Sequence, residues 1–552
     1  MIPYASVFFA LSGPVRETAS IFAIVAGCIF CAQVSGSEAM ATVREELLQI
    51  SGLPSNPEDI VWERLPLLKS IRVKVFEGEE NISAFNHHPT IAWHDGRFFA
   101  AWSNGDRDED ASGQRILYST SEDGRDWTDA VKLADGISER AYTPCGFWIR
   151  EGGIFALAAL RDARDGASRS DDNPLIAYRW RKKDSVFEYH SVIAGDFFAN
   201  DAPRMGPDGR WLMIGKPNGG EASSRIRKRI AKGGVRSMDD WSFAPLSQAE
   251  VAHDTFWYVL PNGHMMVMEG IGHVPDRFLI RMNSVDGGES WSEPVVTNFP
   301  EADSRLLGLR LSTGHYVLLS NPNPWRYRVP ISIAVSKDGL VYDRMANVRV
   351  EQTNKKYSGH AKAPGYQYVR AVERDGRLWV IYSVNKEDVE ISVVPLEEIE
   401  KLYSSEQVYP QREYGPEIVI DNGDKGFETD RVWPIETVAG GQYGPDYAYL
   451  PATARGWASW TPEIRESGRY HVYLRWATIG FSQRSPMDDI VPVEIRHPGG
   501  IDKTTGDHTR YGGAWIFLAA YKLMAGENIQ VKILAGGDGI TVADAVKFVR
   551  TP

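Results

Sequence analysis

The fold class of this chain is decided by the stretch Thr90-Ile91-Ala92-Trp93-His94-Asp95-Gly96-Arg97-Phe98-Phe99-Ala100-Ala101-Trp102. Two short apolar runs flank Asp95-Gly96, a dipeptide that tight hairpins prefer because their turn positions need a positive φ. Similar turns follow at intervals of 57, 56, 54, 51 and 62 residues, at Gly152-Gly153, Asp208-Gly209-Arg210, Asn262-Gly263-His264, Thr313-Gly314-His315 and Asp375-Gly376-Arg377. A single hairpin cannot bury its apolar face, so this repeat predicts radially arranged β units, an all-β, six-bladed β-propeller.

Length and composition limit the possible classes of protein. A chain of 552 residues is too long for one core, and 43% hydrophobic residues with 51 glycines are typical of a folded, turn-rich β protein. The net charge of −12 argues against a nucleic-acid-binding protein, although it allows a local basic pocket for an anionic sugar. The three cysteines are Cys28, Cys31 and Cys145, too few for a disulfide framework.

The N-terminal residues resemble an export signal. An apolar run at 21–32 is followed by the small polar residues Ser35-Gly36-Ser37, as in a signal peptide and its cleavage site. Val25-Ala26-Gly27-Cys28 also resembles a lipoprotein box, so anchoring at Cys28 is an alternative. We therefore expect a secreted or periplasmic protein. No other segment approaches 18 uninterrupted apolar residues, so no membrane span is predicted.

Composition and pattern divide the rest of the chain. The strand pattern at 71–75 is expected to complete the last blade and close the ring, and 396–403 looks like a helical exit from it. The expected segments are a signal peptide at 1–37, an N-terminal extension at 38–68 with a short helix over 41–50, the propeller at 69–400, a linker at 401–414 and a C-terminal β-sandwich at 415–552.

A second motif inside the repeats identifies the family that the propeller resembles. Ser121-Glu122-Asp123-Gly124-Arg125-Asp126-Trp127 and Ser284-Val285-Asp286-Gly287-Gly288-Glu289-Ser290-Trp291 fit the Asp-box, and degenerate copies lie at Ser237-Met238-Asp239-Asp240-Trp241 and Ser336-Lys337-Asp338-Gly339. The region 70–400 thus resembles the sialidase-like propellers with Asp-box (BNR) repeats. The resemblance implies that each box joins the third and fourth strands of a blade, opposite the active-site face.

The C-terminal region resembles another family, the golvesin or xanthan-lyase-type β-sandwich. The similarity is carried by Val419-Ile420-Asp421-Asn422-Gly423-Asp424, Tyr443-Gly444-Pro445-Asp446-Tyr447, Ala458-Ser459-Trp460-Thr461-Pro462, Ser467-Gly468-Arg469-Tyr470-His471-Val472-Tyr473 and Val542-Ala543-Asp544-Ala545-Val546-Lys547-Phe548. Such modules accompany polysaccharide-degrading enzymes. The resemblance implies carbohydrate binding, and a purely architectural role is the alternative.

Polar side chains recur where first strands begin and second strands end, so we expect them to meet around one pocket. The catalytic candidates are His87, His88, Glu269, Tyr366 and Tyr368, and the substrate-binding candidates are Asn104, Arg161, Asp201, Arg204, His253, Arg305 and Arg328. The alternatives are ordinary: turn histidines that are satisfied locally, and arginines that form ion pairs between blades.

Three of these expectations have a specific physical basis. Glu269 follows the apolar run 265–268, where desolvation would raise its pKa and suit a general acid; hydrogen bonding at the blade edge is the alternative. Tyr366 and Tyr368 are expected to point to opposite faces of their strand, so that only one reaches the pocket. The acidic loop 106–110 either delivers a carboxylate over the site or is simply solvated.

The comparison with true sialidases leaves the function open. Sialidases hold the substrate carboxylate with three arginines, and here His87-His88-Pro89 stands where the first is expected, while Arg305 and Arg328 match the later two. The leading hypothesis is a secreted sialidase-like glycosidase acting on terminal, acidic sugars of a complex glycan. The alternatives are a β-eliminating lyase of rhamnose and uronate glycans, or a non-catalytic glycan-binding protein. We predict no metal and no cofactor, and the sequence gives no oligomeric state.

Overall fold

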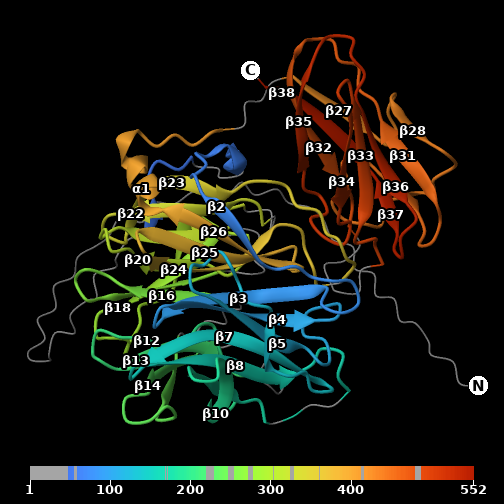
Figure 1. Cartoon of the computed structure of the whole chain (residues 1–552). Coiled ribbons are helices and arrows are strands. Elements are labelled where there is room, and N and C mark those ends of the chain that lie inside the picture. Colours follow the sequence, from blue (N-terminus) through green and yellow to red (C-terminus); the bar gives the residue numbers. More distant parts are fainter. Residues whose placement is uncertain are drawn as a thin grey trace, which may run out of the picture. The chain divides into compact units, whose positions relative to one another are not determined.

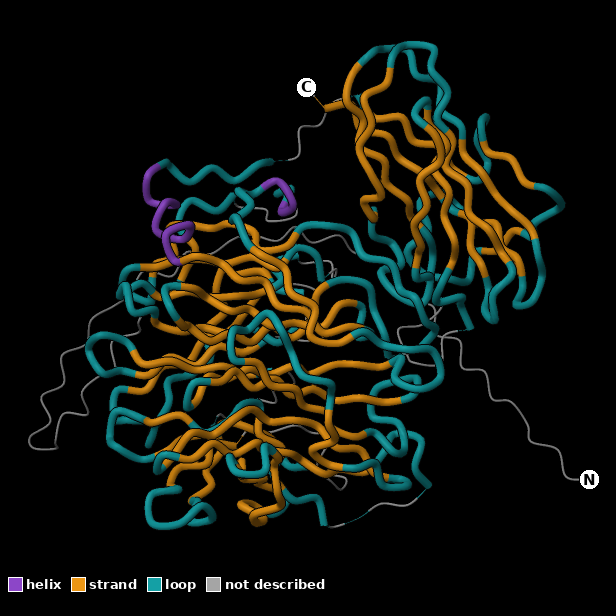
Figure 2. The backbone as a smooth tube through the Cα atoms, in the orientation of Figure 1, coloured by secondary structure: helices purple, strands orange, loops and turns teal. Residues whose placement is uncertain are grey.

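The computed structural model of the chain describes residues 48–551, apart from 55–58, 168–169, 171, 219–228, 247–253, 271–277, 303, 324–327, 360, 412–415 and 479–485. The signal peptide predicted at 1–37 lies outside the described residues. Almost all regular structure in these described residues is β, and their helical segments of three or more residues are α1 (Leu396–Glu400) and the 3₁₀ turns η2 (Trp62–Arg64) and η4 (Lys401–Ser404), drawn purple in Figure 2.

Six antiparallel sheets follow one another along the described part of residues 71–395, as the sequence colours of Figure 1 show. Apart from one early strand that joins the last sheet, their strands run in chain order, so each sheet is one propeller blade. The first three blades are β3 (Phe85–His94), β4 (Arg97–Gly105), β5 (Arg115–Ser121) and β6 (Val131–Ala134); β7 (Arg140–Arg150), β8 (Gly153–Asp162), β9 (Leu175–Arg181) and β10 (Val186–Ala194); and β11 (Phe198–Ala199), β12 (Arg204–Met205), β13 (Trp211–Lys216), β14 (Arg229–Gly233) and β15 (Ser242–Pro245).

The remaining three blades complete the ring. They are β16 (Thr255–Val259), β17 (Met265–Glu269), β18 (Phe278–Ser284) and β19 (Val295–Pro300); β20 (Leu307–Arg310), β21 (Tyr316–Ser320), β22 (Ile331–Ser336) and β23 (Val341–Arg349); and β24 (Tyr366–Arg374), β25 (Arg377–Val384), β26 (Asp388–Pro395) and β2 (Ile71–Phe76). The early strand β2 pairs with β26, which confirms the predicted closure of the last blade. The innermost strand β3 packs against both β7 and β24, so the first blade touches the second and the sixth.

The repeated turns occupy the positions that their sequence predicts. At the first turn both Asp95 (φ 47°) and Gly96 (φ 78°) have the positive φ that this kind of hairpin requires. The Asp-box turns join third to fourth strands, as the resemblance implies. In the first box, the Ser121 hydroxyl accepts a hydrogen bond from the amide of Gly124, and the Trp127 indole donates to the Gly124 carbonyl.

Two expectations at the ends of the propeller need correction. The short helix predicted over 41–50 lies mostly outside the described residues, and its last two residues form strand β1 (Gln49–Ile50), which pairs with β23. The predicted linker at 401–414 is not a free connection along its described part. Tyr409 is buried in the propeller core, and Gln411 forms a β-bridge with Ile60. The helical exit at 396–403 is confirmed by α1 and η4.

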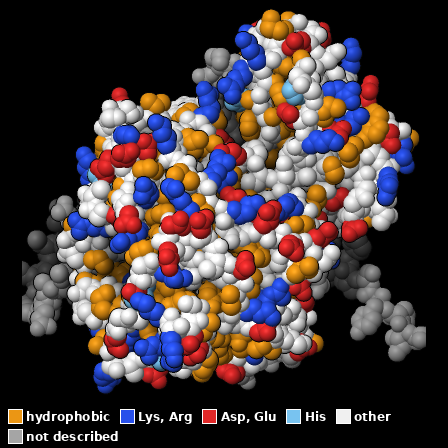
Figure 3. All heavy atoms as spheres, in the orientation of Figure 1, with side chains coloured by type: hydrophobic (Ala, Val, Ile, Leu, Met, Phe, Trp, Pro, Cys, Tyr) orange, Lys and Arg blue, Asp and Glu red, His pale blue; other side chains and the backbone are white. Residues whose placement is uncertain are grey.

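The C-terminal region forms a β-sandwich with its own core. Its described residues form three sheets, β27-β38-β32-β35, β28-β31-β36-β33-β34 and β29-β30-β37, and the core between them buries Trp460, Trp476 and Phe548. The strands are β27 (Glu417–Asp421), β28 (Phe427–Thr429), β29 (Ile435–Glu436), β30 (Tyr447–Leu450), β31 (Gly456–Trp460), β32 (Gly468–Arg475), β33 (Val491–His497), β34 (Gly500–Gly506), β35 (Ile516–Leu523), β36 (Gln530–Ala535), β37 (Thr541–Ala543) and β38 (Ala545–Thr551). The surface drawn in Figure 3 intersperses basic with acidic side chains.

Candidate functional site

Two adjacent histidines at the start of β3 form the first part of the site. Successive side chains of a regular strand point to opposite faces, but the pairing of β3 with β4 shifts register between His87 and Thr90, and His88 has a φ of 54°. The bulge brings the two imidazole rings together, with centroids 4.4 Å apart. Both rings are buried, and burial lowers the pKa of each imidazole below its usual value, so both are neutral near pH 7.

The acidic loop after β4 delivers a carboxylate to these histidines. Oε1 of Glu109 lies 3.3 Å from Nε2 of His88 and 4.0 Å from Nε2 of His87, while its Oε2 accepts a hydrogen bond of 2.6 Å from Nζ of Lys386. Burial alone would raise the pKa of Glu109, but the Lys386 ammonium and the hydrogen bond from His88 hold it well below its usual value. Of the two interpretations left open for this loop, a carboxylate over the site is the one observed.

Tyr368 is the aromatic centre of the site. Its ring centroid lies 4.1 Å from that of His87, and burial raises the pKa of its phenol. Tyr366 and Tyr368 have different partners, but strand alternation is not the reason, since residues two apart in a regular strand share a face. A register shift between Gln367 and Arg370, with a φ of 59° at Tyr368, separates them. Tyr366 instead accepts a hydrogen bond of 3.0 Å from Nη2 of Arg349.

Two predicted arginines flank Tyr368. The guanidinium carbon of Arg305 lies 4.9 Å from the centroid of the Tyr368 ring, and that of Arg328 lies 5.4 Å from it. Arg305 is buried, and its Nε donates a hydrogen bond of 2.9 Å to Oδ1 of Asp254. Arg328 donates to the side-chain oxygen of Gln367 on the same strand as the tyrosine. Two planar cations therefore lie against one aromatic ring.

A second group of cations surrounds Phe198 on β11. Arg161 and Lys216 lie 5.6 and 5.5 Å from its ring centroid, and Arg305 lies 5.9 Å from it. Because Arg305 contacts both Phe198 and Tyr368, the two cationic groups are continuous. Arg161 also pairs with Asp110 at 2.7 Å, in the same acidic loop as Glu109. The predicted residue Arg161 thus belongs to the site.

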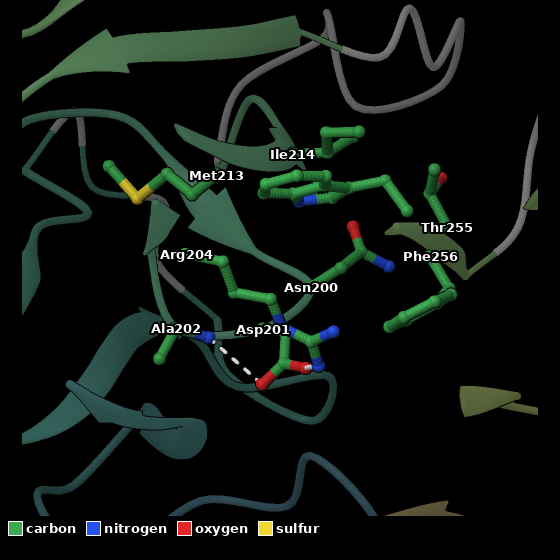
Figure 4. Close-up of a pocket in the computed structure, with 9 residues that line it drawn as sticks. Asn200, Asp201, Ala202, Arg204, Met213, Ile214, Thr255 and Phe256 are labelled. Atoms are coloured by element: carbon green, nitrogen blue, oxygen red, sulfur yellow. Dashed lines mark hydrogen bonds and ion pairs between the residues drawn. The ribbon is translucent and has the colours of Figure 1, made fainter. Parts of the chain in front are cut away.

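Asp201 and Arg204 form a separate ion pair at a narrow pocket between blades three and four (Figure 4). Nη2 of Arg204 donates a hydrogen bond of 2.8 Å to Asp201, and its guanidinium lies over the ring of Phe256. Asp201 also lies 3.6 Å from Nε of Arg370. Arg204 thus pairs within its own blade, whereas the ion pair between blades that was the alternative for the arginines is the one that Arg305 forms with Asp254.

The remaining candidates do not join the histidine and tyrosine cluster. The Asn104 side chain donates to Oδ1 of Asn86 in a fully buried amide network beneath the loop. Glu269 is also fully buried and accepts a hydrogen bond of 2.8 Å from Thr255, which is the blade-edge alternative considered above. His253 lies outside the described residues. The sequence reasoning missed Lys386, although Asn385-Lys386-Glu387 directly follows β25, where second strands end.

Comparison with family models accounts for most of the described chain. A model described as "BNR repeat-like domain" matches residues 96–380, and one described as "Golvesin C-terminal domain" matches residues 418–550. The chain belongs to the BNR repeat-like family. Its BNR propeller carries the histidine, tyrosine and arginine cluster, and its C-terminal sandwich corresponds to the golvesin-type domain, as the two resemblances implied.

Individual relatives are more distant or cover less of the chain. A xanthan lyase from Bacillus sp. (strain GL1) is 32% identical over 141 residues, which is 24% of this chain and 15% of that enzyme's length. A solved sialidase matches with a TM-score of 0.41 at 15% identity, covering 92% of this chain and 51% of that one. A Trypanosoma rangeli sialidase in complex with the inhibitor DANA has a TM-score of 0.47 at 12% identity, covering 88% and 97% of the two chains.

Two further observations concern the described helices and the described cysteine of this chain. None of its described helices is long and apolar enough to cross a membrane. Among the three cysteines, Cys145 lies in the part of the chain that the structure describes. It is buried, and burial raises the pKa of its thiol to about 12, so it is an unreactive core residue.

Proposed function

We propose that this chain is a carbohydrate-active enzyme that cleaves a glycan at an acidic sugar, with the sugar carboxylate held between Arg305 and Arg328. The observation that supports this best is the contact of both guanidinium groups with the one Tyr368 ring, at 4.9 and 5.4 Å from its centroid. Guanidinium groups bind carboxylates through paired, charge-assisted hydrogen bonds. The Tyr368 ring supplies an apolar surface at the same point, so one sugar can contact both.

The charge around this point also favours an anionic ligand. Arg161 and Lys216 add positive charge next to Arg305 through their contacts with Phe198. These cations are buried or half-buried, and in a site of low dielectric each attracts a carboxylate more strongly than an exposed lysine would. The acidic net charge of the whole chain then has little influence on binding at this point.

The leading chemistry is hydrolysis with Tyr368 as the nucleophile. The phenol oxygen would attack the anomeric carbon and displace the leaving sugar, and water would then release the bound sugar. The phenol proton would pass to Asp254 or Glu109, the carboxylates whose charges act on the phenol most strongly, and the leaving sugar oxygen would take up a proton from water. Arg305 and Arg328 would stabilise the developing phenolate as well as the substrate carboxylate.

A second chemistry, β-elimination, is favoured by one observation. Lys386 and His88 hold Glu109 ionised, so this carboxylate is a poor general acid for the leaving group of a hydrolysis. Elimination needs no carboxylic acid. It needs a neutralised uronate carboxylate, which the two arginines would provide and which makes the adjacent proton easier to remove. The neutral imidazole of His87 or His88 would take that proton as the bond to the leaving sugar breaks, and the leaving oxygen would take up a proton from water or from the Tyr368 phenol.

The test is incubation of the full chain with sialylated, rhamnosylated and uronate-rich glycans, followed by product mass and ultraviolet absorbance. Hydrolysis adds one water per cleaved bond and leaves no new chromophore, whereas elimination leaves an unsaturated uronate that absorbs in the ultraviolet. Ligand binding without any product from the panel would contradict an enzyme and favour a binding protein. The Tyr368→Phe variant is expected to lose turnover, and Tyr366→Phe, which alters a tyrosine outside the cluster, is the matched control.

A further inference from the structure

Three side chains with metal-binding atoms converge at the site described above. His87, His88 and Glu109 each offer one ligand atom, and these atoms all lie within 4.8 Å of one another. The two histidines are adjacent in sequence, and they converge only because the bulge in β3 and the positive φ of His88 rotate the second imidazole toward the first. Such bulges re-aim side chains next to functional sites.

A hydroxyl group next to Nδ1 orients each imidazole, and Nε2 is the nitrogen that faces Glu109. Nδ1 of His87 lies 2.8 Å from the hydroxyl of Ser383, and Nδ1 of His88 lies 3.1 Å from the hydroxyl of Ser103. At His87 the hydroxyl can accept a hydrogen bond from Nδ1–H, which leaves the Nε2 lone pair available. Nε2 of His88 donates to Glu109, so an ion bound there would displace that proton, and Nδ1 of His88 would then donate to Ser103. Histidines that bind metals are fixed in this way by hydrogen bonds to their second nitrogen.

The Nε2 nitrogen of His87 lacks a hydrogen-bond partner within the described residues. His87 is fully buried, and its Nε2 makes no hydrogen bond within the described residues. Its nearest carboxylate oxygen is Oε1 of Glu109 at 4.0 Å, beyond hydrogen-bond distance. A buried nitrogen without a partner costs free energy of folding. An ion bound by both Nε2 of His87 and Oε1 of Glu109 would remove that cost.

We propose that His87, His88 and Glu109 bind one divalent transition-metal ion, of the zinc type, through the two Nε2 atoms and Oε1. Bond lengths near 2.0–2.1 Å place tetrahedral ligands about 3.3 Å apart, and His88 and Glu109 are already separated by 3.3 Å. The 4.0 Å from His87 to Glu109 needs a side-chain shift of less than about 1 Å. Two imidazoles and one carboxylate match the preference of such ions, and three protein ligands leave a position open for water or substrate.

Lys386 does not compete for the same oxygen. It donates to Oε2 of Glu109, so Oε1 remains directed at the histidines. The positive charges of Lys386 and of the nearby arginines oppose cation binding, which predicts moderate rather than very tight affinity. This site does not depend on the proposed substrate. A bound ion would supply a Lewis acid beside Tyr368, whose ring contacts both histidines.

The experiment titrates the full chain with metal after treatment with a chelator and dialysis. Zn²⁺ binding is followed by calorimetry and Co²⁺ binding by visible absorption, which reports a site of low coordination number. One ion per chain is expected. Glu109→Gln and His88→Gln should abolish stoichiometric binding, and Ser383→Ala, which removes only the partner of His87, should weaken it about 10- to 100-fold. His190→Gln, at an exposed histidine on β10, is the matched control and should bind like the wild type.

Circular dichroism of each variant confirms that it is folded. A folded wild-type chain that takes up neither ion stoichiometrically would overturn the proposal, as would folded Glu109→Gln and His88→Gln variants that bind with wild-type affinity. The proposed function fails by a different result, the absence of product from every acidic glycan. Metal binding without any product would therefore contradict the function alone, and product without metal binding would contradict the metal site alone.

Discussion

Replacing Arg305 with methionine separates the role of this residue in the fold from its role in the proposed function. Arg305 is buried, donates to Asp254 at 2.9 Å and lies against the Tyr368 ring at 4.9 Å. Methionine keeps most of the apolar stem and removes the charge and all donors. The variant therefore loses a carboxylate-binding group and also leaves the Asp254 carboxylate without its guanidinium.

The two losses have different sizes. A carboxylate bound by two charge-assisted hydrogen bonds, each worth about 1.5–3 kcal/mol, predicts a fall in kcat/KM of roughly 10²- to 10⁴-fold. Breaking a fully buried ion pair costs about 3–5 kcal/mol of unfolding free energy, but the Asp254 side chain is 22% exposed, so a loss of about 2–3 kcal/mol is expected. Adding Asp254→Asn removes the uncompensated charge and should recover most of the stability.

Urea unfolding and turnover of the best acidic glycan are measured for Arg305→Met, Arg305→Lys and the double variant with Asp254→Asn. Arg305→Lys keeps the charge but not the paired donors, so it should remain stable and lose about 10-fold or more in kcat/KM. The double variant should be stable and still inactive. The reasoning is refuted if the double variant regains wild-type turnover, because the activity loss would then come from misfolding rather than from carboxylate binding.

Three further predictions concern other parts of the chain. Trp291→Ala should lower the unfolding free energy by about 2–4 kcal/mol with little change in KM, measured by urea unfolding and kinetics, since the Asp-box tryptophan packs against a blade core; a large KM change at unchanged stability would contradict this. Tyr368→Phe should lower kcat at least about 100-fold. Tyr366→Phe should keep kcat and lose about 1–2 kcal/mol of unfolding free energy, because it loses the hydrogen bond from Arg349. Equal kcat values for the two variants would show that Tyr368 has no catalytic role. Burial raises the pKa of Asp544 in the sandwich from 3.8 to about 7, so the folded state favours the protonated form and stability falls as pH rises from about 4 to about 7, by at most about 4 kcal/mol. Asp544→Asn should flatten this dependence between pH 4 and pH 7 in thermal unfolding, and an unchanged slope would contradict the assignment.

Much of the fold was predictable because local chemistry dictates it. The Asp95-Gly96 turn needs two positive φ values, and the Asp-box at 121–127 bonds to its own amides, so each repeat can be recognised without knowledge of its neighbours. The closing strand β2 was also predictable, because a propeller whose last blade lacks a strand must recruit one from the other end of the chain. The sandwich followed from its sequence similarity.

The residues of the site could be predicted from the sequence only where position in the repeat alone determines which neighbours a side chain contacts. Arg305 and Arg328 were correctly expected near Tyr368, but the bulges at His88 and Tyr368 are not visible as a pattern, and they determine which side chains converge. Glu109 was one of several carboxylates in a loop whose path depends on Lys386, a residue 277 positions away. Arg204 pairs with Asp201, three residues away, instead of contacting Tyr368. The spacing of the repeats does not predict which of these contacts forms.

The central claim, that Arg305 and Arg328 recognise a sugar carboxylate, is tested most directly by comparing one glycan with its carboxyl-reduced form. Reduction of the carboxylate to an alcohol changes the charge and leaves the ring and linkage intact. The wild type is expected to turn over the acidic glycan at least about 100-fold faster than the reduced one, and Arg328→Met should lose most of that preference. Equal turnover of the two glycans by the wild type would contradict the claim.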